Sequence, residues 1–100
     1  MSSIERLQRA IRILDGPGSI QERLASAYRT EVQYLGPEGL DEATAFLLEG
    51  LNDELTKQEA AGDVDAIDMS TRDLTDADAQ ELADQIRALH DYFSGQKPVA

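Results

Sequence analysis

The feature that most constrains the fold is a set of three helix-start signals. Ser2 and Ser19 each stand three residues before a glutamate, and Thr75 stands three residues before an aspartate. In this spacing the hydroxyl of the first residue accepts a hydrogen bond from a free backbone amide in the first turn of a helix. Each signal therefore predicts a helix that begins directly after the serine or threonine.

The apolar residues that follow recur every three or four positions, which places them along one face of a helix. The first two stripes stop at the glycine–proline segments 16–18 and 36–39, because proline cannot continue a helix and glycine readily ends one. A further stripe predicts a third helix from about Pro37 or Leu40 to Ala61. The four stripes are Ile4, Leu7, Ile11 and Leu14; Ile20, Leu24, Tyr28, Val32 and Leu35; Leu40, Ala43, Leu47, Leu51 and Leu55; and Ala79, Leu82, Ala83, Ile86, Leu89 and Phe93.

These stripes predict an all-α, four-helix bundle-like domain. The short connection between the first two helices favours an antiparallel pair. The linker of about residues 62–75 before the last helix is expected to be irregular, and residues 64–69 fit a strand, a loop or an extra helical turn. The 100 residues are enough for one core, so we expect a single helical domain over residues 1–95 and a flexible tail over residues 96–100.

Composition excludes several classes of protein. The chain has no cysteine, which rules out disulfides, thiolate zinc sites and cysteine nucleophiles. Its formal net charge of -11 argues against direct binding to nucleic acid or to an anionic membrane, because both depend on lysine and arginine. No targeting signal or apolar run long enough to span a bilayer is present. The sequence therefore predicts a cytoplasmic protein.

Metal-binding and catalytic patterns do not fit. Counted from Asp63, the calcium-loop template requires a ligand, a glycine and a glutamate where Ile67, Asp68 and Leu74 stand. His90 is the single histidine and lacks the partner spacing of a di-iron site. The chain also has no glycine-framed serine or phosphate-binding loop. We therefore expect no metal, no cofactor and no enzymatic activity.

Charge is distributed unevenly along the chain. Residues 1–30 hold five arginines and three acids, a net charge of +2, whereas residues 31–100 hold four bases and seventeen acids, a net charge of -13. Arg6, Arg9 and Arg12 share one face of the first helix. This basic face is either solvated or a docking site for an acidic partner or for the acidic part of a second copy.

The acidic part predicts a second surface. Carboxylates before and along the last helix can form a continuous acidic strip, which would present charge as a phosphate backbone does and attract a basic groove. An inhibitor that mimics nucleic acid and blocks a DNA- or RNA-binding protein is therefore the alternative function. The strip consists of Asp63, Asp65, Asp68, Asp73, Asp76, Asp78, Glu81 and Asp84.

The function favoured by the sequence is a small, acidic, non-enzymatic module for protein–protein interaction or regulation. The apolar arc of the third helix is wider than one buried face requires, and this width places Phe46, Leu48 and Gly50 at a partner-binding surface. The expected partner is another protein, and a basic protein is one candidate. The same arc predicts a homo-oligomer, most simply a homodimer.

Overall fold

The structure, a computed structural model, describes residues 2–36, 40–60, 62 and 64–93. All the elements it defines there are helical, which confirms the all-α class. They are α1 (Ser3–Leu14), α2 (Ile20–Thr30), the 3-10 helix η1 (Val32–Tyr34), α3 (Glu42–Thr56), α4 (Ala66–Arg72) and α5 (Asp76–Phe93).

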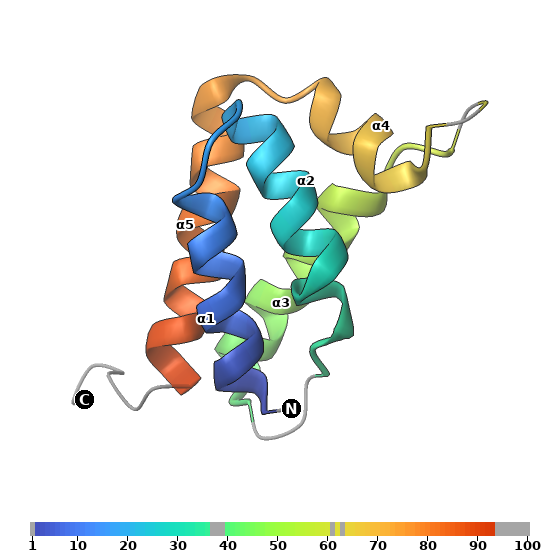
Figure 1. Cartoon of the computed structure of the whole chain (residues 1–100). Helices are drawn as coiled ribbons and strands as arrows, with labels where there is room; N and C mark the ends of the chain where they lie inside the picture. The colour runs from blue at the N-terminus through green and yellow to red at the C-terminus, as the bar shows by residue number, and fades with distance from the viewer. Residues whose placement is uncertain (1, 37–39, 61, 63, 94–100) are drawn as a thin grey trace.

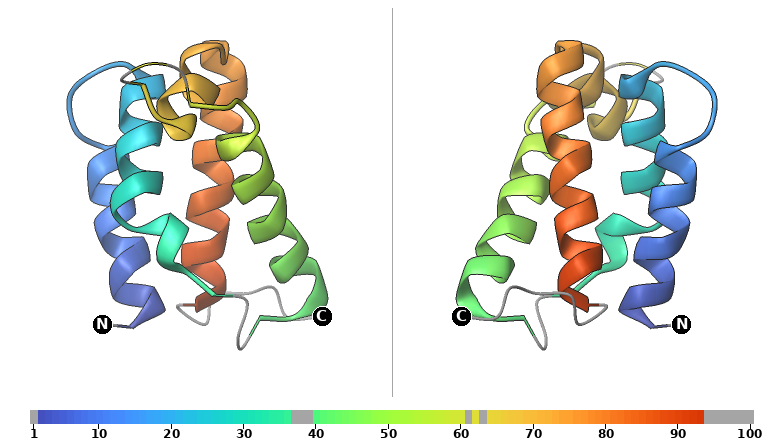
Figure 2. Two further views of the ribbon diagram at one scale, coloured as in Figure 1. Left: turned by 90° about the vertical axis from the view of Figure 1, so that its right-hand side faces the viewer. Right: turned by 90° about the vertical axis from the view of Figure 1, so that its left-hand side faces the viewer.

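The four longer helices form a bundle in which the chain direction alternates (Figure 1). α1 packs against α2 and α5, while α3 packs against α4 and α5. The short helix α4 lies across the end of the bundle where α5 begins, and α1 begins at the other end, where α5 finishes. Figure 2 shows α1 and α3 at opposite edges, so their outward surfaces face away from each other.

The predicted starts of three helices are confirmed. The Ser2 hydroxyl accepts a hydrogen bond from the Glu5 amide at 3.3 Å, and the Ser19 hydroxyl accepts one from the Glu22 amide at 3.1 Å. For α5, the Thr75 hydroxyl accepts a hydrogen bond from the Asp78 amide at 3.1 Å. These bonds join residues three apart, so local sequence alone determines them.

The second helix ends earlier than its apolar stripe predicts. α2 stops at Thr30, because the backbone of Glu31 leaves helical geometry at φ -130° and ψ -57°. The short helix η1 then carries Val32 into the core. The carboxylate of Glu31 is turned toward α1, where it meets the Arg6 guanidinium at 3.4 Å.

The third helix is shorter than predicted at both ends. It begins at Glu42, because the Asp41 carboxylate caps it by accepting a hydrogen bond from the Thr44 amide at 2.8 Å. It ends at Thr56, and the Gln58 amide just beyond donates instead to the buried Ser70 hydroxyl at 3.0 Å. Residues 57–60 are exposed and have no apolar side chain larger than alanine to bury.

The segment between α3 and α5 contains the short helix α4. Of the three conformations considered for residues 64–69, the structure shows a helix from Ala66, capped by the Asp65 carboxylate at 2.9 Å from the Asp68 amide. Asp63 and the predicted tail of residues 96–100 lie outside the described residues.

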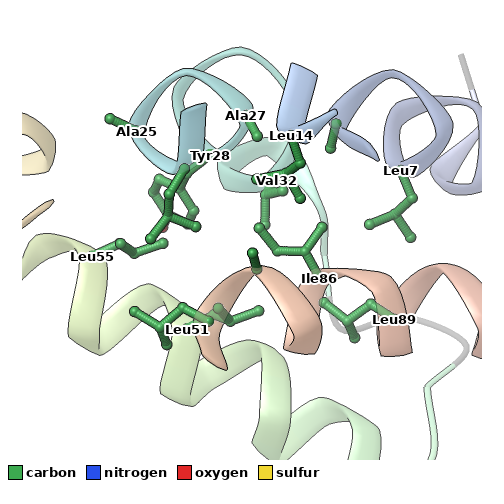
Figure 3. Packing of buried hydrophobic residues seen from close by; sticks show 14 of the residues in the cluster. Leu7, Leu14, Ala25, Ala27, Tyr28, Val32, Leu51, Leu55, Ile86 and Leu89 are labelled. Atoms are coloured by element: carbon green, nitrogen blue, oxygen red, sulfur yellow. The ribbon is translucent and has the colours of Figure 1, made fainter. Parts of the chain in front are cut away.

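One hydrophobic core joins these helices (Figure 3). Alanines belong to this core as well as leucines: Ala10, Ala27 and Ala79 are all 0% exposed. Small side chains at these positions allow neighbouring helices to approach closely. The largest fully buried residues are Leu7, Leu14, Leu24, Val32, Leu51, Leu55, Ser70, Ile86 and Leu89.

Candidate protein-binding surface

The most unusual part of the surface is the side of α3 that faces away from the bundle. Phe46 lies there with 77% of its area exposed, more than the 62% of Tyr34, the other large apolar residue that is exposed in the described chain. Residues three or four apart are neighbours on a helix, so Phe46 adjoins Ala43, Glu49 and Gly50. We define the outer face of α3 as the residues Glu42, Ala43, Phe46, Glu49, Gly50 and Asp53.

The outer face of α3 is acidic as well as apolar. Glu42, Glu49 and Asp53 are exposed, and none of them forms an ion pair within residues 2–36, 40–60, 62 and 64–93. The nearest base along the helix, Lys57, already pairs with Glu54 at 3.0 Å. A group that covers Phe46 must therefore accept contact with three uncompensated negative charges.

Leu48, predicted to share this surface with Phe46, lies in the core. It is 3% exposed, because it projects from the opposite side of the helix together with Leu51 and Leu55. Gly50 is partly exposed, and a Cβ atom built on it would meet nothing within 4 Å. The surface therefore retains Phe46 and Gly50, whereas Leu48 contributes only through its edge.

That edge forms part of a cleft between α3 and the end of η1. The cleft has a volume of about 230 Å³ and is lined by Leu35, Ala45, Leu48, Glu49 and Asn52. The Asn52 side chain is fixed, because its Oδ1 accepts a hydrogen bond of 2.6 Å from the Tyr28 hydroxyl. Sequence reasoning missed this cleft, since nothing local relates Tyr28 to a residue 24 positions later.

Burial of Tyr28 raises the pKa of its hydroxyl above the usual value, and the negative charge of Asp53 raises it further. The hydroxyl therefore remains a proton donor at neutral pH and above. Its hydrogen bond fixes the orientation of the Asn52 amide, whose Nδ2 donates to no group in the described chain. The cleft thus combines apolar walls, one carboxylate and one oriented amide donor.

The predicted basic face on α1 is smaller than the sequence indicates. Arg6 is occupied within the fold, because it pairs with Glu31 at 3.4 Å and lies 5.1 Å from the ring centre of Tyr34. Arg9 and Arg12 are exposed and form no ion pair with the part of the chain that the structure describes. Two arginines therefore remain free for contact outside the molecule.

The predicted acidic strip is divided in two. Asp65 and Asp68 bind Arg29 of α2, with N–O distances of 2.9 Å and 2.8 Å, and thereby tie α4 to α2. Along α5, Asp76 accepts a hydrogen bond from Gln21 at 2.9 Å and Asp84 accepts one from Gln80 at 3.0 Å.

The remaining members of the strip are exposed. Asp73 lies at the end of α4, and Asp78 and Glu81 lie beside Glu54 in an open cavity of about 330 Å³ between α3 and α5. On α5, the acidic residues Asp76, Asp78, Glu81 and Asp84 are exposed and form no ion pair among the described residues.

The clamp between Arg29 and α4 predicts a local response to acid. The Asp68 amide and Arg29 lower the pKa of Asp65 below its ordinary value. Because the pKa is lower in the folded state, the carboxylate stabilises the fold above the unfolded-state value of about 3.9, and this contribution disappears as the pH falls through the folded value. We expect the amides of α4 to lose hydrogen-exchange protection below about pH 4 before those of α1 do.

The matched control for this measurement is Asp65→Asn, which keeps the shape of the side chain and cannot titrate. Its α4 amides should be less protected at neutral pH, and their protection should change less with acid than in the wild type. Equal loss of protection in α1 and α4 as the pH falls would contradict the prediction.

No cluster of three or more histidine, cysteine, aspartate or glutamate side chains within the described ranges is arranged to hold a metal ion. Similarly, none of the helices defined there combines the length and hydropathy needed to cross a membrane. His90 is partly buried at the edge of the core stripe, with its Nδ1 3.5 Å from an Asp91 carboxylate oxygen.

No protein-family model, curated protein or solved structure matches the chain.

Proposed function

We propose that this protein is a binding module that docks another protein on the outer face of α3. The observation that carries the proposal is Phe46, an aromatic side chain that is 77% exposed in the first half of α3. Exposure of this ring to water is unfavourable, and aromatic residues are enriched at the centres of protein interfaces. We propose that the module acts through this contact and without catalysis.

The charges around Phe46 support a basic partner. Glu42, Glu49 and Asp53 would attract lysine or arginine side chains, which favours fast and salt-sensitive association. A symmetric homodimer through α3 would instead bring two sets of these carboxylates together, and like charges across an interface are unfavourable. A basic protein is therefore our first candidate, and a homodimer is a separate outcome of the test.

The test compares Phe46→Asp with Ala88→Asp, which places the same charge on the exposed side of α5. Proteins captured from extract of the source cells are identified, and the affinity of each purified candidate is measured against the wild type and both variants. We expect Phe46→Asp to lower the affinity for the physiological partner by about tenfold or more. Ala88→Asp should have little effect on that affinity. Equal affinities for the wild type and Phe46→Asp would exclude this surface.

Two additional measurements separate the other functions. Sedimentation of the wild type and Phe46→Asp detects a homodimer that depends on Phe46. The nucleic-acid mimic is the second candidate, because Asp78, Glu81 and Asp84 are exposed without ion pairs among the described residues of α5. For a mimic, added DNA should compete for the captured partner, and replacement of these acids should matter more than replacement of Phe46.

A further inference from the structure

We infer that the cleft between α3 and η1 receives a basic amphipathic helix, one of whose large apolar side chains enters the cleft beside Phe46. This inference rests on the proposed function and specifies the partner's chemistry. Amphipathic helices commonly bind other proteins by placing an apolar face in a groove, with anchors at helical spacing. The cleft lies on the same helix as Phe46, and Ala45 and Glu49 in its wall are one and three positions from Phe46.

The shape of the cleft fits one bulky aliphatic side chain. Leu35 and Leu48 are almost completely buried beneath it, and the small side chain of Ala45 leaves its wall open. Asn52 supplies the orienting polar group, because the Tyr28 hydroxyl occupies its Oδ1 and leaves the amide nitrogen as a donor. A small number of fixed polar groups in an apolar cleft is the usual basis of specific binding.

Charge determines which helix can occupy the cleft. Glu49 is part of its wall, and Glu42 and Asp53 lie one turn away from Phe46 and Glu49 on the outer face of α3. None of these carboxylates forms an ion pair with a described residue. An incoming helix therefore needs lysine or arginine beside its apolar anchor, and an acidic helix of the same hydrophobicity is repelled.

A second copy of the chain supplies this combination poorly. Its α3 is acidic, and its only exposed unpaired arginines on α1 are Arg9 and Arg12 within the described residues. Leu7 and Leu14 of α1 are 0% and 1% exposed, and the other large apolar residues of this helix, Ile4, Ile11 and Ile13, are only partly exposed. Each copy also carries a formal net charge of -11, so two copies repel each other. We therefore assign the cleft to a helix of a different protein.

The experiment uses the full chain and two synthetic helical peptides, each with leucines along one face. One peptide carries lysines on both flanks, and in the other each lysine is replaced by glutamate. Binding is followed by backbone amide chemical shifts at about 0.1 M and about 1 M salt, between which the Debye length falls from about 10 Å to about 3 Å. We expect only the lysine peptide to shift the amides around Ala45, Glu49 and Asn52, and we expect high salt to weaken it.

Matched variants localise the site. Ala45→Leu fills the cleft and should lower the affinity for the lysine peptide about fivefold or more, whereas Ala88→Leu on α5 should leave that affinity unchanged. Glu49→Gln should weaken it roughly two- to fivefold, and Asp84→Asn, the same change of charge on α5, should have no comparable effect. Both leucine substitutions are at positions that are not buried, and amide spectra show whether each variant is folded.

Four results would overturn the inference: no binding of the lysine peptide, equal binding of the glutamate peptide, equal effects of Glu49→Gln and Asp84→Asn, or a concentration-dependent self-association that Ala45→Leu abolishes. The proposed function fails separately. Phe46→Asp could abolish binding of a physiological partner while the lysine peptide fails to bind the wild type. In that case the outer face of α3 remains a docking surface, and only the basic helix in the cleft is rejected.

Discussion

Replacement of Leu51 with alanine is expected to lower the free energy of unfolding by about 2–5 kcal/mol, the range for a leucine truncated in a packed core. Leu51 is 0% exposed and lies where α3 faces α5 (Figure 3). A domain of this size has a total stability of only about 5–15 kcal/mol. The variant should therefore unfold at a clearly lower urea concentration, as measured by the helical circular dichroism signal.

Phe46→Ala is the matched control for this measurement. It removes a larger side chain from the same helix, but that side chain is 77% exposed, so we expect a change within about 0.5 kcal/mol. Equal destabilisation by the two substitutions would show that α3 has a different orientation on the bundle. The comparison therefore also tests whether the ring of Phe46 is available to a partner.

The second large effect is expected at the ion pair between Arg6 of α1 and Glu31, the residue directly after α2. Arg6→Met should destabilise the fold by about 1–3 kcal/mol, because the buried Glu31 carboxylate loses its ion-pair partner. Glu31 is 8% exposed, and its carboxylate lies 3.4 Å from the Arg6 guanidinium. The substitution also removes the contact between Arg6 and the Tyr34 ring, whose centre is 5.1 Å away.

Two further variants test the cause of this effect. Arg9→Met makes the same substitution at an exposed position of α1 and should be nearly neutral. The double variant Arg6→Met/Glu31→Gln should be less destabilised than Arg6→Met alone, because glutamine does not leave a charge buried. If the double variant is as unstable as the single one, the loss comes from packing of the arginine and not from the carboxylate.

Local signals account for the helix starts that the sequence predicted correctly. A side chain at Ser19 reaches an amide three residues later whatever the rest of the fold does. Asp65 offers the same kind of signal, with Asp68 three residues on, and it does begin a helix. The apolar residues around it are too few to show a helical stripe, so the sequence left residues 64–69 open between a strand, a loop and a helical turn.

Contacts between distant residues decide what the sequence left open. The end of α2 depends on Glu31 meeting Arg6, 25 residues earlier. The end of α3 depends on Ser70, whose buried hydroxyl binds an amide 12 residues earlier. Helical periodicity carries no information about either partner.

The candidate site shows the same limit. The unusual width of the apolar arc on α3 is visible in the sequence, and it leads correctly to Phe46 as an exposed aromatic residue. The arc does not show which of its flanks faces the core, and that choice places Leu48 inside. The cleft beside Phe46 requires η1 to pack near α3, so no stretch of the sequence by itself predicts it.

The alternating direction of the helices has a practical consequence for how binding is assayed. α1 begins, α5 ends and α3 begins at the same end of the bundle, and Phe46 is in the first half of α3 (Figure 1). A fluorophore or surface anchor attached beside the first turns of α3 would stand close to the ring and compete for the space a partner needs. The exposed segment 57–60, at the far end of α3, is the better place for a fluorophore or an immobilisation handle.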